Sequence, residues 1–478
     1  MVGKRSVTFH TKITELKREV LHILDLVPLS TSSVAPAFSI AAAYGVMVSL
    51  AGPQAIMSTF ITAIPFLLIA LIFRQFNLHF PHAGASYHWG AKVVGKRFGA
   101  FQAWIVTLAY FLSIPPIVVP AGEYTLALLY SLGWIPYSAY SSQFWVSVVG
   151  IAWILIATVP LLLGAKPTAR FTEAFLMIEL VVLALFLGLG FSHFKVVNPF
   201  SWNWFFSTRV DWTGVVQASV VAATIVDGWE IDSYAAEESK RPNKWPGLSG
   251  VIGLLSVLVI YGVAMPLMTM ETPLNALAQS VDPLYTWAQY VVPPFAWLIN
   301  LAVLASTASS LWLTEFILSR AWYAMARDNL LPSLFGWVNA RFKSPWANVL
   351  VMSGLNVLIN ALMLAFPSVQ AFFTLVLSSA GIFLAMEFLL DSVSGVLFFW
   401  VRHRPMELEG VGPHVHWAYR VISVVASLSL GAIIALGLYY SPSNIGWEFP
   451  YVFAGLMVFS LVFVYLSRRV EVKDFMVG

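Results

Sequence analysis

About twelve long apolar runs fill the sequence, and each is long enough to cross a membrane as a helix. They lie at 27–49, 53–75, 98–130, 143–163, 171–192, 213–238, 247–270, 294–326, 346–366, 370–400, 418–440 and 449–468. A helix needs about 20 apolar residues to cross the hydrocarbon core. Strands are disfavoured in lipid because an open sheet edge leaves backbone groups unpaired, and these runs are too long for barrel strands. Charged residues make up only 10% of the chain, against about 25% in soluble proteins. The sequence therefore predicts an all-α integral membrane protein.

Basic residues are concentrated in every second loop, and this pattern predicts the orientation of the chain in the membrane. With the N-terminus in the cytoplasm, all but two of the 26 Lys and Arg residues fall on the cytoplasmic side, and the exceptions are Lys195 and Arg209. Cytoplasmic loops carry such an excess, and a miscounted span would reverse it from that point onward. We predict a cell-membrane protein with both termini in the cytoplasm. Residues 5–24 are expected to form a short surface helix before the first span.

Two of the predicted spans contain residues that interrupt a helix. In the first, Pro36 follows a run of hydroxyl residues, and a mid-helix proline removes a backbone donor. In the sixth, Gly228 lies among Asp227, Glu230 and Asp232. Backbone groups freed in lipid cost several kcal/mol, roughly, unless they are satisfied, so such breaks are tolerated where they line a cavity. A purely structural kink is the alternative for either break taken alone.

The positions of the two breaks indicate an internal repeat. The first and sixth spans begin two sets of five helices, and secondary transporters place breaks at matching positions of inverted repeats, near the bilayer midplane. We predict a cytoplasmic N-terminal segment (1–26), a first repeat (27–192), a second repeat (213–400), two further helices (418–468) and a cytoplasmic tail (469–478). Paired breaks favour a solute-binding site between them.

Four segments of the chain resemble the amino acid–polyamine–organocation (APC) superfamily, whose members share the five-plus-five inverted-repeat fold of the leucine transporter. They are 25–38 in the first span, Phe80-Pro81-His82-Ala83-Gly84-Ala85-Ser86-Tyr87 after the second, Gly228-Trp229-Glu230 with the following 236–242, and 319–332 after the eighth. One departure is that the glycine-rich triplet of the family falls here on Pro36-Ala37-Phe38. The resemblance implies a transporter that works by alternating access.

The resemblance also implies where the solute binds. Backbone amides near the first break would meet an anionic group, carbonyls near the sixth-span break would accept from an ammonium, and Trp229 would cap the pocket, with one wall on the eighth span. The predicted solute-binding residues are Ser33, Ala35, Pro36, Ala37, Phe38, Val226, Asp227, Gly228, Trp229 and Thr314.

Several acidic residues fall within or near the spans, and no Lys or Arg lies deep in any span to neutralise them. Ionisable groups inside a membrane are costly and are usually functional. Glu179 is central to the fifth span, and the resemblance places it beside the first break and the hydroxyls of Ser309 and Ser310. Three interpretations stay open for it: a proton-coupling carboxyl, a sodium ligand together with Ser309 and Ser310, or a structural hydrogen bond. Glu387 and Asp391, four residues apart, are either a gate, a second proton site or a solvated helix end.

Other polar residues have ordinary interpretations. We expect Glu237 and Glu238 to form a solvated face beside Lys240 and Arg241, and His79, His82 and His88 to be interfacial histidines without a carboxylate partner at metal spacing. Without cysteine, disulfides and thiolate metal sites are excluded. We find no hydrolase, zincin or P-loop motif. We therefore expect no enzyme activity, cofactor, metal or nucleic-acid partner.

The sequence thus predicts a secondary active transporter of a small amino acid, coupled to protons or else to sodium. A transporter or exchanger of an organic cation such as a polyamine is the first alternative, because aspartates lie near the predicted pocket. A solute sensor built on the same fold is the second alternative.

Overall fold

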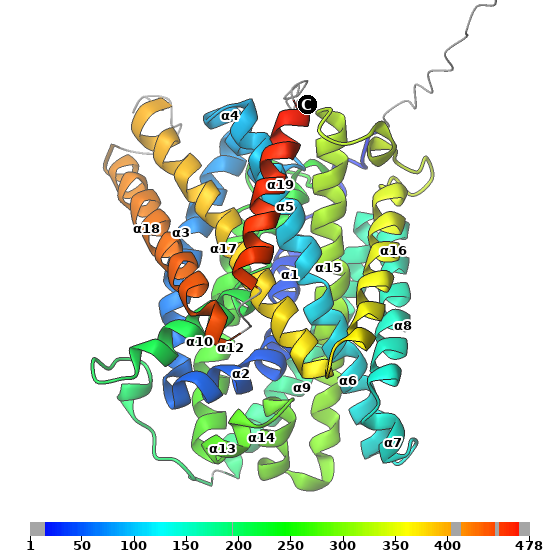
Figure 1. The fold of residues 1–478 in the computed structure, drawn as a ribbon, viewed down its shortest axis with the longest axis vertical. Helices are drawn as coiled ribbons and strands as arrows, with labels where there is room; N and C mark the ends of the chain where they lie inside the picture. Colours follow the sequence, from blue (N-terminus) through cyan, green and yellow to red (C-terminus); the bar gives the residue numbers. More distant parts are fainter. Residues whose placement is uncertain (1–14, 194, 403–412, 445–448, 468–478) are drawn as a thin grey trace, which may run out of the picture.

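The structure is a computed structural model that describes residues 15–193, 195–402, 413–444 and 449–467. It is an all-α protein whose long helices run broadly along one axis (Figure 1). Within the described residues the only strand-like pairing is an isolated bridge between Leu21 and Ser239. The α-helices are α1 (Ile23–Val34), α2 (Pro36–Ala51), α3 (Ala55–His79), α4 (Ala85–Val93), α5 (Lys96–Ser113), α6 (Pro115–Ser131), α7 (Tyr137–Tyr140), α8 (Gln143–Leu163), α9 (Ala165–Ser192), α10 (Trp212–Ile225), α11 (Ile231–Tyr234), α12 (Leu248–Glu271), α13 (Leu274–Ala278), α14 (Pro283–Val291), α15 (Ile299–Arg327), α16 (Trp346–Leu362), α17 (Val369–Leu397), α18 (Pro413–Asn444) and α19 (Phe449–Leu466).

Helices occupy all twelve predicted spans. Among the described residues, ten helical segments are long and apolar enough to cross a membrane; the first of them, Ile23–His79, holds two predicted spans, and the shorter apolar helix Trp212–Ile225 lies at the sixth. The fold is therefore that of a multi-pass membrane protein. The long third segment is two helices, α5 and α6, which meet at Ile114 just before Pro115 and Pro116, because prolines remove the backbone donors that would continue α5.

The predicted surface helix at the N-terminus is wrong over the residues that can be checked. Residues 15–22 are not helical, and α1 begins at Ile23, earlier than the predicted 27. A capping box fixes this start, because the His22 ring accepts from the backbone of α1 while Asp25 accepts from the His22 amide. Residues 1–14 and the predicted tail 469–478 lie outside the described part of the chain.

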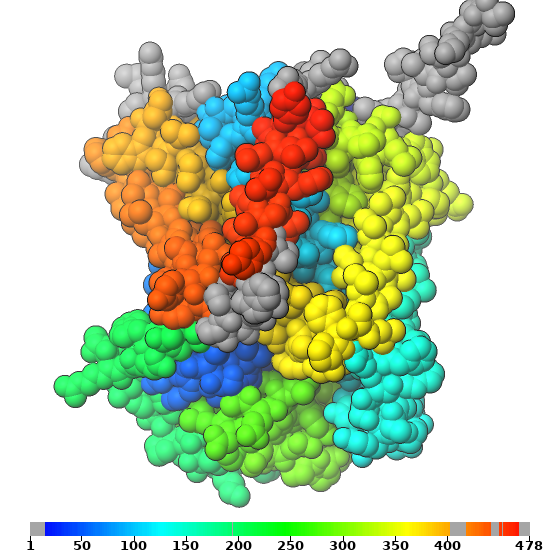
Figure 2. All heavy atoms as spheres, in the orientation of Figure 1, coloured from blue at the N-terminus to red at the C-terminus, as the bar shows by residue number. Residues whose placement is uncertain are grey.

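The buried centre of the bundle is α15, which packs against α1, α2, α5, α6, α8 and α9. The last two helices lie on the outside: α18 packs on α17, α3 and α10, and α19 packs on α5, as the orange and red surfaces of Figure 2 show. They expose large apolar side chains such as Leu428, Tyr451 and Leu466, which is how a lipid-facing surface is built.

The two ends of the molecule carry different elements. The short helix α4 lies at one end, and α7, α13 and α14 lie at the opposite end (Figure 1). We call these the α4 end and the α13–α14 end.

Candidate solute-binding site

The first predicted break is confirmed. α1 stops at Val34, and Ala35 has left-handed backbone angles, φ 55° and ψ 68°. α2 then starts with Pro36 in its first turn, a position where the missing proline N–H would be unpaired in any case. A left-handed residue other than glycine costs about 1–2 kcal/mol, so the surrounding fold holds this break in place.

The second predicted break is confirmed as well. α10 stops at Ile225, residues 226–230 are not helical, and only the short helix α11 follows. Gly228 has φ 102°, a conformation that side-chain-bearing residues rarely adopt. A Cβ added there would lie 2.8 Å from the carbonyl carbon and oxygen of Ser33. Glycine therefore lets the two broken segments touch each other.

This contact yields the first test. Gly228→Ala should lower the free energy of unfolding by about 1–3 kcal/mol, because the new methyl group adds strain at positive φ and collides with the backbone of Ser33. Thermal unfolding in detergent measures the change. Gly354→Ala is the matched control, since it lies in a helix with nothing within 4 Å of the added Cβ. Equal unfolding temperatures for the two variants would contradict the close contact.

A small cavity lies between the two breaks. Five of the predicted solute-binding residues line it, as does Ser310: Ser33, Phe38, Asp227, Gly228 and Thr314. A second cavity, lined by Glu123, Gln279 and Ser280, shares the lining residue Ala42 with the first and lies on its α13–α14 side.

The other five predicted residues do not line this cavity: Ala35, Pro36, Ala37, Val226 and Trp229. Trp229 was expected to cap the pocket, but its side chain is fully buried and stacks on Phe388, with ring centroids 5.6 Å apart and planes at 22°. Burying a large apolar ring in the core is more favourable than exposing it to a cavity. Tyr110 of α5 also lines the cavity, although no sequence motif marks it.

The backbone donors at the start of α2 already have partners. The Ala37 amide donates to Glu179 Oε1 at 2.9 Å, and the Phe38 amide donates to Ser306 Oγ at 3.1 Å. Glu179 is fully buried. Its carboxyl therefore sits at a helix N-terminus, where an anion is favoured. These are the amides that were expected to receive a solute carboxylate.

The hydroxyl that reaches Glu179 belongs to Ser306, at 2.8 Å, rather than to Ser309 or Ser310. Ser309 donates to the Ser306 carbonyl and accepts from Ser32, at 2.8 Å. Ser310 donates to the Ser33 carbonyl at 3.4 Å. Ser306 lies one helical turn before Ser309 and Ser310 on α15, so the same spacing argument could have included it.

The α4 end is closed by buried ion pairs, which corrects the prediction of a solvated face at 237–238. Glu238 is fully buried and forms a bidentate ion pair with Arg320. Arg320 Nε donates to Glu238 Oε2 at 3.1 Å, and Nη2 donates to Oε1 at 3.3 Å. Glu237 is buried and pairs with Arg327 at 2.5 Å. These arginines lie at the end of α15, too far along the chain for the local charge pattern to reveal them.

Backbone pairing joins the N-terminal segment to the same end. The Val20 and Leu21 amides donate to the Glu238 carbonyl, at 2.9 and 3.0 Å, and the Lys240 amide donates back to the Leu21 carbonyl at 2.9 Å. At the start of α1, Asp25 pairs with Lys166, at 2.5 Å. The segments that precede the first break and follow the second are thus bonded to each other.

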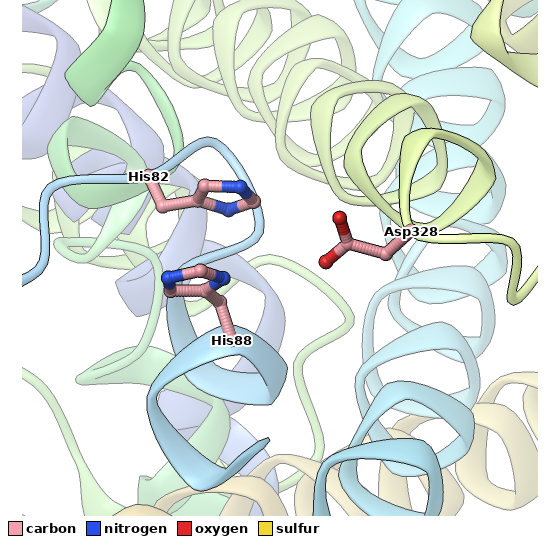
Figure 3. Close-up of side chains that lie close together, drawn as sticks. All are labelled: His82, His88 and Asp328. Carbon is pink, nitrogen blue, oxygen red and sulfur yellow. The ribbon is translucent and has the colours of Figure 1, made fainter. Parts of the chain in front are cut away.

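Two of the three histidines expected to lack carboxylate partners lie beside carboxylates. His82 and His88 are buried and stacked, with ring centroids 3.7 Å apart, and Asp328 of the α15 terminus points toward them (Figure 3). Their candidate ligand atoms lie within 4.8 Å of one another, a spacing that could hold a metal ion. However, the Gly84 amide donates to His82 Nδ1 and Arg327 lies against Nε2. Both ring nitrogens of His82 therefore face N–H groups, which disfavours a cation there.

The chain is similar in sequence to known membrane proteins. The family model for amino acid permeases matches residues 21–462. The methylthioribose transporter of Bacillus subtilis (strain 168) is 24% identical over 323 residues, covering 65% of this chain and 68% of that protein. The branched-chain amino acid permease BcaP of the same organism is 23% identical over 327 residues, with coverages of 65% and 68%. The low-affinity putrescine importer PlaP of Escherichia coli (strain K12) is 24% identical over 388 residues, with coverages of 78% and 79%. The chain therefore belongs to the amino acid permease family of the APC superfamily, whose members are membrane transporters and not enzymes.

Proposed function

We propose that this protein is a secondary active transporter of a small amino acid, driven by protons that bind Glu179. The observation that carries the proposal is the hydrogen bond from the Ala37 amide to Glu179 Oε1. It joins the candidate coupling carboxyl to the helix break beside the cavity.

Competition for the start of α2 would couple the proton to the solute. An ionised Glu179 holds the Ala37 amide. Ala37 does not line the cavity itself but precedes the lining residue Phe38, and its amide is one of the helix N-terminal donors that a solute carboxylate would need. Protonation of Glu179 weakens this hold and frees the amide. Solute and proton then favour each other's binding, and by linkage the effect is the same in both directions, typically 5–150-fold.

The closed α4 end fits one state of an alternating-access cycle. In this state a second cavity adjoins the first on the α13–α14 side, and the ion pairs of Arg320 and Arg327 lie at the α4 end. In the orientation predicted from the basic residues, the cavity faces outward. Transport requires these pairs to open once the solute and the proton are bound.

A panel of solutes tests this proposal through thermal shifts of the purified protein. Glycine, alanine and leucine should raise the unfolding temperature, and at equal concentration more strongly at acidic than at alkaline pH, because the proton frees the Ala37 amide. Repeating the panel with and without sodium separates proton from sodium coupling. Stabilisation by these amino acids that does not depend on pH would contradict the competition. Uptake into proteoliposomes separates a transporter from a sensor, which would bind without flux.

An organic cation is the second candidate solute, and Asp227 is the observation that favours it. Asp227 lines the cavity, and its buried Oδ1 atom has no hydrogen-bond partner within the described part of the chain. Among the residues that the structure describes, no Lys or Arg lines the cavity, so an ammonium would be attracted to this carboxylate. A panel in which putrescine and other diamines stabilise the protein while neutral amino acids do not would replace the first candidate with this one.

A further inference from the structure

A second group of carboxyls lies apart from Glu179, between the cavity and the α4 end. Glu387 and Asp391 are one turn apart on α17, and both are fully buried. Glu387 Oε1 accepts from Ser86 at 2.9 Å and from Tyr234 at 2.7 Å. Asp391 Oδ1 accepts from Gln102 at 2.7 Å. This burial excludes the solvated helix end that was one of the sequence interpretations.

Tyr110 connects this pair to the cavity. Its hydroxyl lies 2.9 Å from Glu230 Oε1 and 3.3 Å from Glu387 Oε1, and Tyr110 is also a lining residue of the cavity. A phenol has a single hydrogen to donate, so it cannot serve both carboxylates fully. A proton on one of the two carboxyls would remove this competition.

The residues that surround the pair in the described part of the chain bring polar and acidic side chains to it. Tyr110, Ser86, Gln102 and Tyr234 reach it from α5, α4 and α11, and the segment after α10 adds the carboxyls of Glu230 and Asp227. Among the described residues, no Lys, Arg or His side chain forms an ion pair or a hydrogen bond with Glu387 or Asp391.

Two buried oxygens have no hydrogen-bond partner among the described residues, Glu387 Oε2 and Asp391 Oδ2. Burying several ionised carboxylates together without a cation is strongly unfavourable, and such groups bind protons instead. A proton bound to either oxygen supplies the missing positive charge without needing space for an ion. The unpartnered oxygens therefore mark where a proton would bind.

We propose that Glu387 and Asp391 form a second proton-binding site, separate from Glu179, which exchanges its proton during transport. The proton comes from water on one side of the membrane, forms an O–H bond at one of the two unpartnered oxygens, and returns to water on the other side. The hydrogen bond from Tyr110 to Glu387 connects proton binding to the cavity. The hydrogen bond from Ser86 of α4 to Glu387 connects proton binding to the α4 end. The role in transport rests on the proposed function, whereas proton binding itself does not.

Infrared spectroscopy of the protein in lipid tests proton binding without any solute. Titration from acidic to alkaline pH should show a protonated-carboxyl band that Glu387→Gln and Asp391→Asn each diminish. Both substitutions keep an oxygen acceptor for the surrounding donors, and thermal unfolding shows whether each variant is folded. Asp391→Glu should restore the signal if the asparagine variant unfolds. Glu15→Gln, at an exposed acid, should leave the band unchanged.

Two outcomes of the titration would overturn the inference. One is a band that neither substitution changes, which would mean that the pair holds no proton. The other is a band that remains at every pH where the protein is folded, which would mean that the proton is fixed and structural.

Transport of leucine, arginine and putrescine in proteoliposomes then tests exchange. Proton-driven accumulation of whichever probe is carried should fall about tenfold or more in Glu387→Gln, while exchange of that solute across the membrane without a gradient continues. Unchanged proton-driven accumulation would refute the coupling role. If the wild type carries none of the probes, the proposed function fails while the infrared result on proton binding still stands.

Discussion

Glu179→Gln is expected to abolish proton-driven accumulation of the solute while leaving solute binding measurable. The amide oxygen of glutamine can still accept from Ala37 and Ser306, so the break at Ala35 should keep its geometry. The variant cannot bind and release a proton, however, so pH should no longer control the start of α2. Uptake into proteoliposomes with and without a pH gradient measures this loss, and thermal shifts at two pH values measure binding.

Glu315→Gln is the matched control for this experiment. Glu315 is another fully buried glutamate, and neither of its carboxyl oxygens has a hydrogen-bond partner among the described residues. Removing its ionisable group tests whether the loss of any buried carboxyl disturbs transport. Its pH dependence should match that of the wild type. If Glu179→Gln behaves like the wild type as well, Glu179 has no part in coupling.

The largest effect on stability is expected at the ion pair between Glu238 and Arg320. Glu238→Gln would leave the fully buried guanidinium of Arg320 without its counter-charge. Breaking a buried pair from one side typically lowers the free energy of unfolding by about 3–5 kcal/mol. Thermal unfolding in detergent should therefore show a marked fall in the melting temperature.

Two further variants identify the cause of that fall. Glu15→Gln removes one partner of the exposed pair with Arg18 and should change little, since exposed pairs contribute little to stability. The double variant Glu238→Met with Arg320→Met should recover part of the loss, because it removes both buried charges together. A melting temperature for Glu238→Gln equal to that of the wild type would show that the pair does not stabilise this end.

The membrane fold and the two helix breaks could be predicted from the sequence because their causes are local. Apolar runs of span length, Pro36 and Gly228 each act through their own stretch of chain. Glu179 could be found in the same way, as a carboxyl in an apolar helix.

The partners of the buried charges could not be predicted, because they come from distant parts of the chain. Arg320 lies far in sequence from Glu238, and Asp328 lies far from His82 and His88. Local charge patterns made these residues look solvated. Tyr110 was missed for the same reason, since an ordinary tyrosine within an apolar helix gains its role only from the carboxyls that surround it.

The backbone pairing of Leu21 with Glu238 and Lys240 has a mechanical consequence. It bonds the stretch before α1 to the stretch after α11. The first stretch precedes the break at Ala35, and the second follows the break at Gly228. A movement of α1 relative to α2 therefore requires α11 to move in the same direction. The backbone angles at Ala35 and Gly228 are expected to change together during transport.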